Sequence, residues 1–542
     1  MTTTGADIIG QALAQAGATH AFGIPGGEVL ALMQGLDAAG LRFVLVKHEN
    51  GGGFMAEGLW HMTGALPVLV ATLGPGVANA VNVVANAMQD RVPLIFLTGC
   101  VDAVDAETYT HQVFDHQAML RPVVKGSFRL APGAVGAGMA KALALATAGQ
   151  PGPVHVDVPI SVAEGLATEV PPVRPWTAAP GLPSPGALAA ALTAIKAAQR
   201  PLAIAGVDAV IAGAGPAIAE FCRAHAIPLI TTYKAKGLMP EADPLCLGAA
   251  GLSPLADRIV MPLIAEADTI LLLGYDPIEM RIGWRNPFGP GQTVIDMAPA
   301  RRDHGMHRAD IPMVGDLCLT VAALRHDAPP RWAAGQPGIA RAALQSAFTG
   351  PGVWGPHAVF ATLRAAMPPE TVITADSGAH RILVSQMWQC PAPRLMLQSS
   401  ALCTMACAVP LAAGAKLGRP GVPVLAFVGD AGLEMGAGEL ATLSAQRLPI
   451  VICVLVDHSL TLIEMKQRAG QRPNLGVDFG GPGADGHPGG TDFAALARAF
   501  GGHGVDVSDS AALMHQARAA LTRDRFTLIA AQIPRRAYDG AF

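Results

Sequence analysis

Residues 424–457 constrain the fold of this chain more than any other stretch. An apolar run ends at Gly429 and Asp430, a helical pattern follows over 439–446, and a second apolar run ends at Asp457. In such a strand–helix–strand unit the strands are parallel, so both aspartates emerge at the same carboxyl edge of a sheet. Two carboxylates beside small residues suit Mg²⁺ carrying a diphosphate, although strand-end aspartates also cap turns in many sheets of this kind.

Composition sets the size and class of the protein. A chain of 542 residues is too long for one core and indicates about three domains. The apolar content of 51% fits parallel sheets that are buried on both faces. We therefore expect an α/β protein with three doubly wound parallel-sheet domains. The net charge of −4, without a basic tract, argues against nucleic acid or an anionic membrane surface as a partner.

The cysteines and the apolar segments indicate a cytoplasmic protein. The eight cysteines are scattered without a CxxC pair or a zinc-ligand spacing, as expected of reduced thiols. The first residues lack the basic flank and long apolar centre of a signal peptide. Residues 399–415 carry no charge, but Ser, Thr and Pro interrupt this short run, so we expect a buried helix and no membrane span.

Two stretches rich in proline divide the chain. Residues 171–187 and 327–355 have the composition of exposed linkers. They separate a first domain over 1–170, a central domain over 188–326 and a last domain over 356–542, each with alternating strand and helix patterns.

Glycine-rich motifs follow the strands of the first domain. They read, in order, FGIPGG from Phe22, HENGGGFMAEG from His48 and GPGVAN from Gly74, followed by ANAMQDRVPLIFLTG. This ordered set resembles the pyrimidine-binding domain of the acetolactate synthase-like family of thiamine diphosphate (ThDP) enzymes. The pair Asp430 and Asp457 resembles the family's diphosphate and metal motif, although Ala431 replaces its usual Gly and Asp457 its usual Asn. The resemblance therefore covers both end domains.

The resemblance implies roles for residues of the first domain. Glu49 takes the place of the catalytic glutamate, and Pro75 and Asn79 line the cofactor's pyrimidine. Residues 105–125 are also similar to benzaldehyde lyase, and Gln112 matches a glutamine that faces the reacting carbon. His111 stands where acetolactate synthases usually have Phe, and it either reaches the pocket or caps a helix. The adjacent histidine pair of pyruvate decarboxylases is absent, which weakens assignment as a simple decarboxylase.

In the last domain the resemblance implies a complete diphosphate site. Asp430, Asp457 and the carbonyl of Ser459 would hold Mg²⁺. The residues expected around the cofactor are Gly378, His380, Cys403, Met405, Gly429, Ala431, Gly432, Leu462 and Ile463. Outside this motif, a histidine after a strand is commonly a cap, and a methionine in an apolar stretch is commonly core.

The central domain and the substrate are less defined. Some relatives bind FAD in the central domain, but residues 273–281 depart from their usual pattern, which argues against FAD and favours a spacer and interface. Glu464 and Lys466 stand where acetolactate synthases usually have Arg and Trp, so the resemblance does not fix the substrate. We expect a carboligase or lyase acting on a small 2-oxo acid or 2-hydroxy carbonyl compound. The alternatives are a non-oxidative 2-oxo acid decarboxylase and a catalytically silent ThDP-binding scaffold or regulatory subunit.

Relatives form the active site between the first domain of one subunit and the last domain of another. The resemblance therefore implies a homodimer at least, and we expect a homotetramer.

Overall fold

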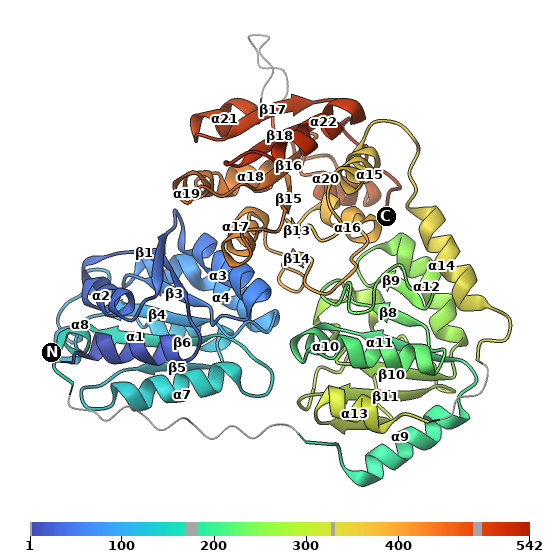
Figure 1. The fold of residues 1–542 in the computed structure, drawn as a ribbon, viewed down its shortest axis with the longest axis horizontal. Coiled ribbons are helices and arrows are strands. Elements are labelled where there is room, and N and C mark those ends of the chain that lie inside the picture. Colours follow the sequence, from blue (N-terminus) through green and yellow to red (C-terminus); the bar gives the residue numbers. More distant parts are fainter. Residues whose placement is uncertain (1–2, 168–180, 327–330, 481–489) are drawn as a thin grey trace.

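A computed structural model describes residues 3–167, 181–326, 331–480 and 490–542. The chain forms three lobes, coloured blue, green and orange-red in Figure 1. Each lobe is built on one six-stranded sheet in which every strand pair is parallel, with helices on both faces. The expected α/β class with three doubly wound parallel sheets is confirmed.

The first lobe has the strand order β2-β1-β3-β4-β6-β5. Its central strand β3 is completely buried, as its continuous apolar sequence requires. The elements are α1 (Gly5–Gln15), β1 (His20–Ile24), α2 (Leu30–Ala38), β2 (Arg42–Leu45), α3 (Glu49–Thr63), β3 (Val68–Ala71), α4 (Pro75–Gln89), β4 (Ile95–Cys100), α5 (Ala103–Ala106), α6 (His116–Leu120), β5 (Gly126–Arg129), α7 (Val135–Thr147), β6 (Val154–Pro159) and α8 (Ile160–Glu164).

The central lobe has the order β12-β11-β10-β7-β8-β9. Its elements are α9 (Pro185–Ala197), β7 (Pro201–Ala205), α10 (Val207–Ile211), α11 (Gly215–Ala224), β8 (Leu229–Thr231), β9 (Cys246–Ala249), α12 (Pro254–Glu266), β10 (Thr269–Leu273), β11 (Thr293–Ala298), β12 (Ile311–Val314) and α13 (Leu317–Ala323).

The last lobe has the order β14-β13-β15-β16-β18-β17, which repeats the topology of the first lobe. Its elements, after α14 (Gln336–Ala347), are α15 (Pro356–Ala366), β13 (Val372–Ala375), α16 (Ala379–Met387), β14 (Met396–Gln398), α17 (Ala408–Gly418), β15 (Val424–Gly429), α18 (Asp430–Gly436), α19 (Glu439–Ala445), β16 (Val451–Val456), α20 (Thr461–Ala469), α21 (Phe493–Ala499), β17 (His503–Val507), α22 (Ser510–Ala520) and β18 (Thr527–Gln532).

The two expected linkers differ from simple loops where they are described. Residues 171–180 and 327–330 lie outside the described residues. Helix α9 begins at Pro185, inside the first expected linker, and α14 lies wholly inside the second. Within the second expected linker these twelve residues form a helix, because Ala340 and Leu344 give α14 an apolar side that packs against α12 and β9.

Helices α3 and α17 join the first and last lobes. A Cβ on Gly58 would lie 2.2 Å from the Leu411 carbonyl oxygen, and one on Gly414 would lie 1.9 Å from that of Met55. The two backbones therefore touch where glycine replaces a side chain. The uncharged run at 399–415 forms a loop and most of buried α17, as expected. Among the described residues, no helix combines the length and apolar character needed to cross a bilayer.

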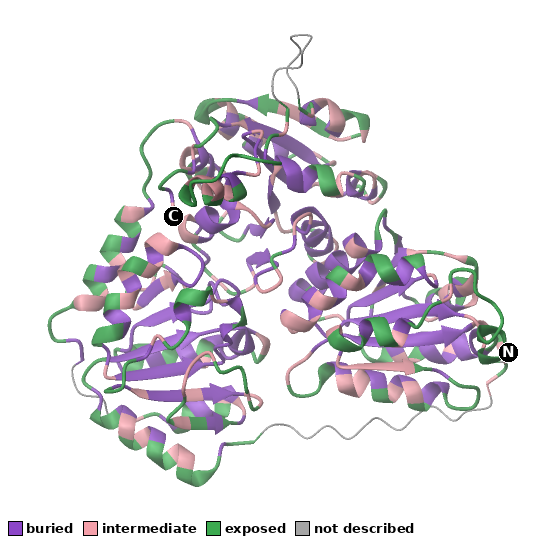
Figure 2. Cartoon of the chain, turned by 180° about the vertical axis from the view of Figure 1, so that it is seen from behind, coloured by how far each residue is buried: buried purple, intermediate pink, exposed green. Residues whose placement is uncertain are grey.

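Burial follows this plan in all three lobes. The strands are buried, and the exposed residues lie mostly on the outer helices and loops (Figure 2). The carboxyl ends of the strands and the turns that follow them are therefore the places where buried polar groups can meet a ligand.

Candidate active site

The strand–helix–strand unit that organises the last lobe is present as expected. Strands β15 and β16 pair in parallel, with Gly429 opposite Leu455, so Asp430 and Asp457 emerge at the same sheet edge. Helix α18 begins at Asp430 itself, so the segment after the strand is already helical. Both carboxylates are buried, with 4% and 5% of the residue exposed.

The two aspartates form a site with excess negative charge. Asp430 accepts hydrogen bonds from the backbone N–H groups of Ala431 and His458, both at 2.8 Å. Asp457 accepts from the Ser459 N–H at 3.3 Å and from the Thr461 hydroxyl. Burial and, to a lesser extent, the neighbouring Asp430 carboxylate together raise the pKa of Asp457 to about 7. No lysine or arginine of the described residues forms an ion pair with either carboxylate, so the site fits a bound cation.

One pocket collects the last-lobe residues that the sequence pointed to. It lies where the turn after β13, the loop before α17, the start of α18 and the start of α20 converge. Its lining includes Gly378, His380, Cys403, Met405, Gly429, Asp430, Ala431, Gly432, Asp457, Ser459, Leu462 and Ile463.

Asp376 holds two walls of this pocket together. Its carboxylate accepts hydrogen bonds from the backbone N–H groups of Ala406 and Cys407 at 2.8 and 2.7 Å. A Cβ on Gly432 would lie 2.0 Å from Asp376 Oδ2, so only glycine permits this approach of α18. The loop bonded in this way includes Cys403, whose φ of +58° places it in the left-handed region.

Two polar groups in the pocket wall have no partner. His380 Nε2 and the Tyr538 hydroxyl are buried and make no hydrogen bond within the described part of the chain. Burial lowers the pKa of His380 to about 3, so its ring is neutral and carries one N–H. Buried groups of this kind are normally hydrogen-bonded, and a diphosphate would provide acceptor oxygens. Tyr538 was not predicted, because it comes from the tail after β18 and belongs to no motif.

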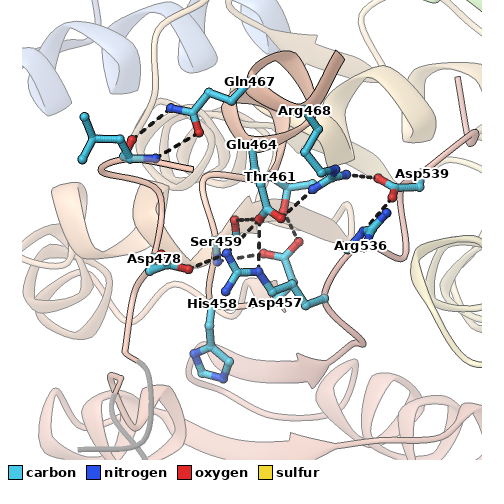
Figure 3. A network of polar contacts seen from close by, with 12 residues as sticks. Asp457, His458, Ser459, Thr461, Glu464, Gln467, Arg468, Asp478, Arg536 and Asp539 are labelled. Atoms are coloured by element: carbon cyan, nitrogen blue, oxygen red, sulfur yellow. Dashed lines mark hydrogen bonds and ion pairs between the residues drawn. The ribbon is translucent and has the colours of Figure 1, made fainter. Parts of the chain in front are cut away.

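Helix α20 turns two faces to different surroundings. Leu462 and Ile463 line the pocket, whereas Glu464 is only 3% exposed and points into a polar network (Figure 3). Glu464 accepts from the Ser459 hydroxyl and from Arg468, both at 2.5 Å, and pairs with Arg535 at 3.0 Å. Glu464 therefore anchors the helix rather than lining the pocket.

In the first lobe, Glu49 is placed at the start of α3. It is 4% exposed, and Asn79 Nδ2 donates to its Oε2 at 3.0 Å. In the described residues no group donates to Oε1, so one oxygen is fixed and the other is available. Pro75 and Asn79 are both exposed on α4, beside this carboxylate.

The loop after α5 lies against the same turn. Gln112 has φ of +60°, and its carbonyl oxygen would be 2.3 Å from a Cβ on Gly74, the residue before Pro75. Glycine at 74 thus lets the Gln112 loop approach the start of α4. His111 is exposed and packs edge-on against Tyr109, while Asp115 caps α6. The residue that caps α6 is thus Asp115 and not His111.

Comparison with known proteins finds cofactor-binding domains in the lobe that carries Glu49 and in the lobe that carries the pocket. Residues 3–119 match the thiamine pyrophosphate (ThDP) enzyme N-terminal TPP binding domain, residues 188–324 the central domain and residues 376–531 the C-terminal TPP binding domain. The chain is 31% identical to the acetolactate synthase large subunit of Parasynechococcus marenigrum, over 98% of this chain and 88% of that protein. The chain belongs to the ThDP enzyme family.

Two further relatives show the range of reactions in this part of the family. The chain is 31% identical to a probable 2-ketoarginine decarboxylase of Pseudomonas aeruginosa, over 97% of this chain and 94% of that protein. It is 29% identical to acetolactate synthase of Bacillus subtilis, over 93% of this chain and 88% of that protein. The chain is thus a ThDP enzyme of the acetolactate synthase and decarboxylase group.

The residues of this ThDP enzyme fit the cofactor and a divalent cation, but in two separate parts. The pocket with Asp430 and Asp457 offers carboxylates and unpartnered polar groups, and Glu49 lies on the first lobe. No residue of the described range 3–167 is among those lining the pocket. Within one chain, the structure therefore does not bring Glu49 and Gln112 to the pocket.

The carboxyl ends of β7 and β10 in the central sheet are closely packed and carry paired charges. At the carboxyl ends of β7 and β10, a Cβ on Gly206 would lie 2.7 Å from the Cα of Tyr275, so backbone fills the crevice. Buried Asp208 is the second residue of α10, the helix that follows β7, and pairs with Arg302 at 2.6 Å and Arg91 at 3.6 Å. A carboxylate at this position repels a diphosphate, and the arginines are already paired with it.

Proposed function

We propose that this ThDP enzyme uses Mg²⁺ to make or break a carbon–carbon bond next to a carbonyl group. Its substrate would be a small 2-oxo acid or 2-hydroxy carbonyl compound. The observation that carries the proposal is the buried Glu49 carboxylate, which Asn79 fixes through one oxygen and leaves available through the other. A pocket with two metal-binding carboxylates on the same chain supplies the other half of the site.

The roles of the residues follow from their chemistry. ThDP, when bound, supplies a carbon nucleophile that attacks the substrate carbonyl. Glu49 would exchange a proton with the cofactor's pyrimidine nitrogen, and Asn79 would keep the carboxylate oriented. Asp430, Asp457 and the Ser459 carbonyl would bind Mg²⁺, and Met405 would offer the cofactor an apolar contact. Gln112 would face the substrate, with Leu462 and Ile463 forming an apolar wall.

Within one chain, Glu49 lies apart from the pocket with Asp430 and Asp457. This separation supports an assembly in which subunits share active sites. We propose that Glu49 of one subunit completes the pocket of another, which requires a homodimer and is compatible with a homotetramer. Exposure of Pro75 and Asn79 beside Glu49 agrees with a surface that meets a partner subunit. The eight free cysteines agree with a cytoplasmic location.

A 2-oxo acid decarboxylase is the second candidate. It is favoured by the similarity to the probable 2-ketoarginine decarboxylase, which extends over nearly the whole of both chains. A decarboxylase protonates the reaction intermediate, whereas a carboligase passes it to a second carbonyl compound, so the products distinguish them. A catalytically silent scaffold would have no use for the Glu49–Asn79 pair.

The test is purification with ThDP and Mg²⁺, followed by incubation with a panel of 2-oxo acids and 2-hydroxyacyl compounds. Mass spectrometry of the products then separates ligation, cleavage and decarboxylation. Glu49→Gln is expected to lower kcat by about 10²–10⁴-fold, the range typical of a lost acid–base group. Glu370→Gln, at an exposed turn before β13, serves as the control and should leave kcat unchanged. Near-normal turnover by Glu49→Gln would overturn the proposal.

A further inference from the structure

Glu439 is a buried carboxylate outside the pocket. It begins α19, in the same strand–helix–strand unit that carries Asp430 and Asp457, and it is 3% exposed. Its Oε1 accepts hydrogen bonds from the backbone N–H groups of Lys47 and His48, both at 3.0 Å. Its Oε2 accepts from the Thr442 hydroxyl at 2.7 Å. A carboxylate of the last lobe therefore holds the two residues that precede Glu49 in the first lobe.

The packing around this carboxylate leaves it little freedom. A Cβ on Gly51 would lie 2.5 Å from Glu439 Oε1, so the first turn of α3 rests directly on it. A Cβ on Gly438 would meet that of Lys47 at 3.3 Å. Hydrogen bonds from two consecutive N–H groups to an ionised acceptor are stronger than neutral ones and fix direction as well as distance. The start of α3 is thus held from the last lobe by Glu439, in addition to the contact that Asn79 of its own lobe makes with Glu49.

We infer that Glu439 is a positioning residue for Glu49. It fixes the backbone at Lys47 and His48. This backbone in turn sets the position and direction of the Glu49 side chain at the start of α3. The inference rests on the proposed function, in which Glu49 meets the cofactor. It adds that the unit presenting Asp430 and Asp457 to one cofactor also holds, through Glu439, the catalytic glutamate of the same chain. If subunits share active sites, the strand–helix–strand unit of each subunit contributes to two sites. It presents Asp430 and Asp457 to one site and positions the Glu49 that enters the other.

Loss of Glu439 should displace Glu49 and lower the catalytic rate without changing the pocket. Displacement of a catalytic group by about 1 Å can cost about 10²-fold in rate even when the change lies outside the chemistry. The pocket that would hold ThDP and Mg²⁺ is not lined by Glu439, so their affinity should change little. If Glu439 only stabilised the fold, its loss would lower the free energy of unfolding, and kcat would not fall independently of the ThDP affinity.

The experiment compares Glu439→Ala, Glu439→Asp and Glu439→Gln in the full-length enzyme. Three quantities are measured: kcat on the substrate found in the panel, ThDP affinity from tryptophan fluorescence with saturating Mg²⁺, and deuterium uptake of the peptide covering residues 44–52 without cofactor. We expect Ala and Asp to increase deuterium uptake there and to lower kcat by about 10²-fold. Gln keeps an acceptor oxygen and should retain most activity. The Asp variant keeps the charge, so it remains informative if the Ala variant does not fold.

Gln446→Ala is the matched control. Gln446 also belongs to this unit and accepts a hydrogen bond from Arg42 across the same lobe interface, but it does not touch residues 47–49. It should leave all three quantities unchanged. Normal kcat in the Asp variant, or an equal loss in Gln446→Ala, would overturn the inference. Failure of the proposed function shows separately, as normal turnover by Glu49→Gln.

Discussion

Asp457 places a second buried carboxylate beside Asp430 at the proposed diphosphate site, at a position where the resemblance to ThDP enzymes implies Asn. The charge lies beside the Asp430 carboxylate in a buried position, and this raises the pKa of Asp457 to about 7 from an ordinary value near 3.8. Without a cation, Asp457 is therefore protonated below about pH 7. Mg²⁺ binds the carboxylate, so metal binding must displace that proton.

This competition predicts a pH dependence of metal affinity. In the presence of ThDP, the Mg²⁺ affinity should fall by up to about tenfold for each pH unit below 7 and become flat above it. Isothermal titration between pH 5.5 and 8.5 measures the slope. Asp457→Asn removes the titrating group and keeps an oxygen ligand, so its profile should be flatter. An equal slope in the Asn variant would show that another group titrates.

Helices α3 and α17 are the elements that fix the position of Glu49 relative to the pocket within a chain. Their backbones touch at Gly58 and Gly414, and α3 begins with Glu49. Gly414→Ala would place a methyl group against the Met55 carbonyl, which requires the helices to separate. Overpacking of this kind costs about 1–3 kcal/mol in the free energy of unfolding.

Thermal unfolding checks this prediction, with Gly421→Ala as the control, because a Cβ at Gly421 meets no atom within 4 Å. Since α3 carries Glu49, we also expect kcat to fall in Gly414→Ala. Wild-type stability in that variant would mean that the helices do not pack through these glycines.

The strands, their parallel pairing and the shared sheet edge of Asp430 and Asp457 could be predicted from local patterns, whereas the other pocket residues of the last lobe were expected only from the resemblance to ThDP enzymes. Apolar runs ending in Gly-Asp or Asp reveal a strand and its edge without knowledge of distant contacts. Glu439 and Tyr538 could not be predicted, because their roles depend on partners far along the chain. Helix α14 was missed for another reason. The residues around it are rich in Pro and Gly, and its apolar side is buried only by packing against α12 and β9.

On the scale of the whole molecule, the repeated topology of the first and last lobes places Glu49 and Asp430 at corresponding sheet edges of different domains. The pocket around Asp430 includes no described residue of the first lobe. The central claim is therefore that one catalytic site combines Glu49 of one subunit with the pocket of another.

Subunit complementation tests this claim most directly. Glu49→Gln and Asp430→Ala chains, each expected to be inactive alone, are mixed, unfolded and refolded together. Random pairing makes half of the dimers mixed, and each mixed dimer has one intact site of two, so about a quarter of wild-type kcat per subunit should return. If each site lies within one chain, every site contains a substitution and no activity returns, which would contradict the account.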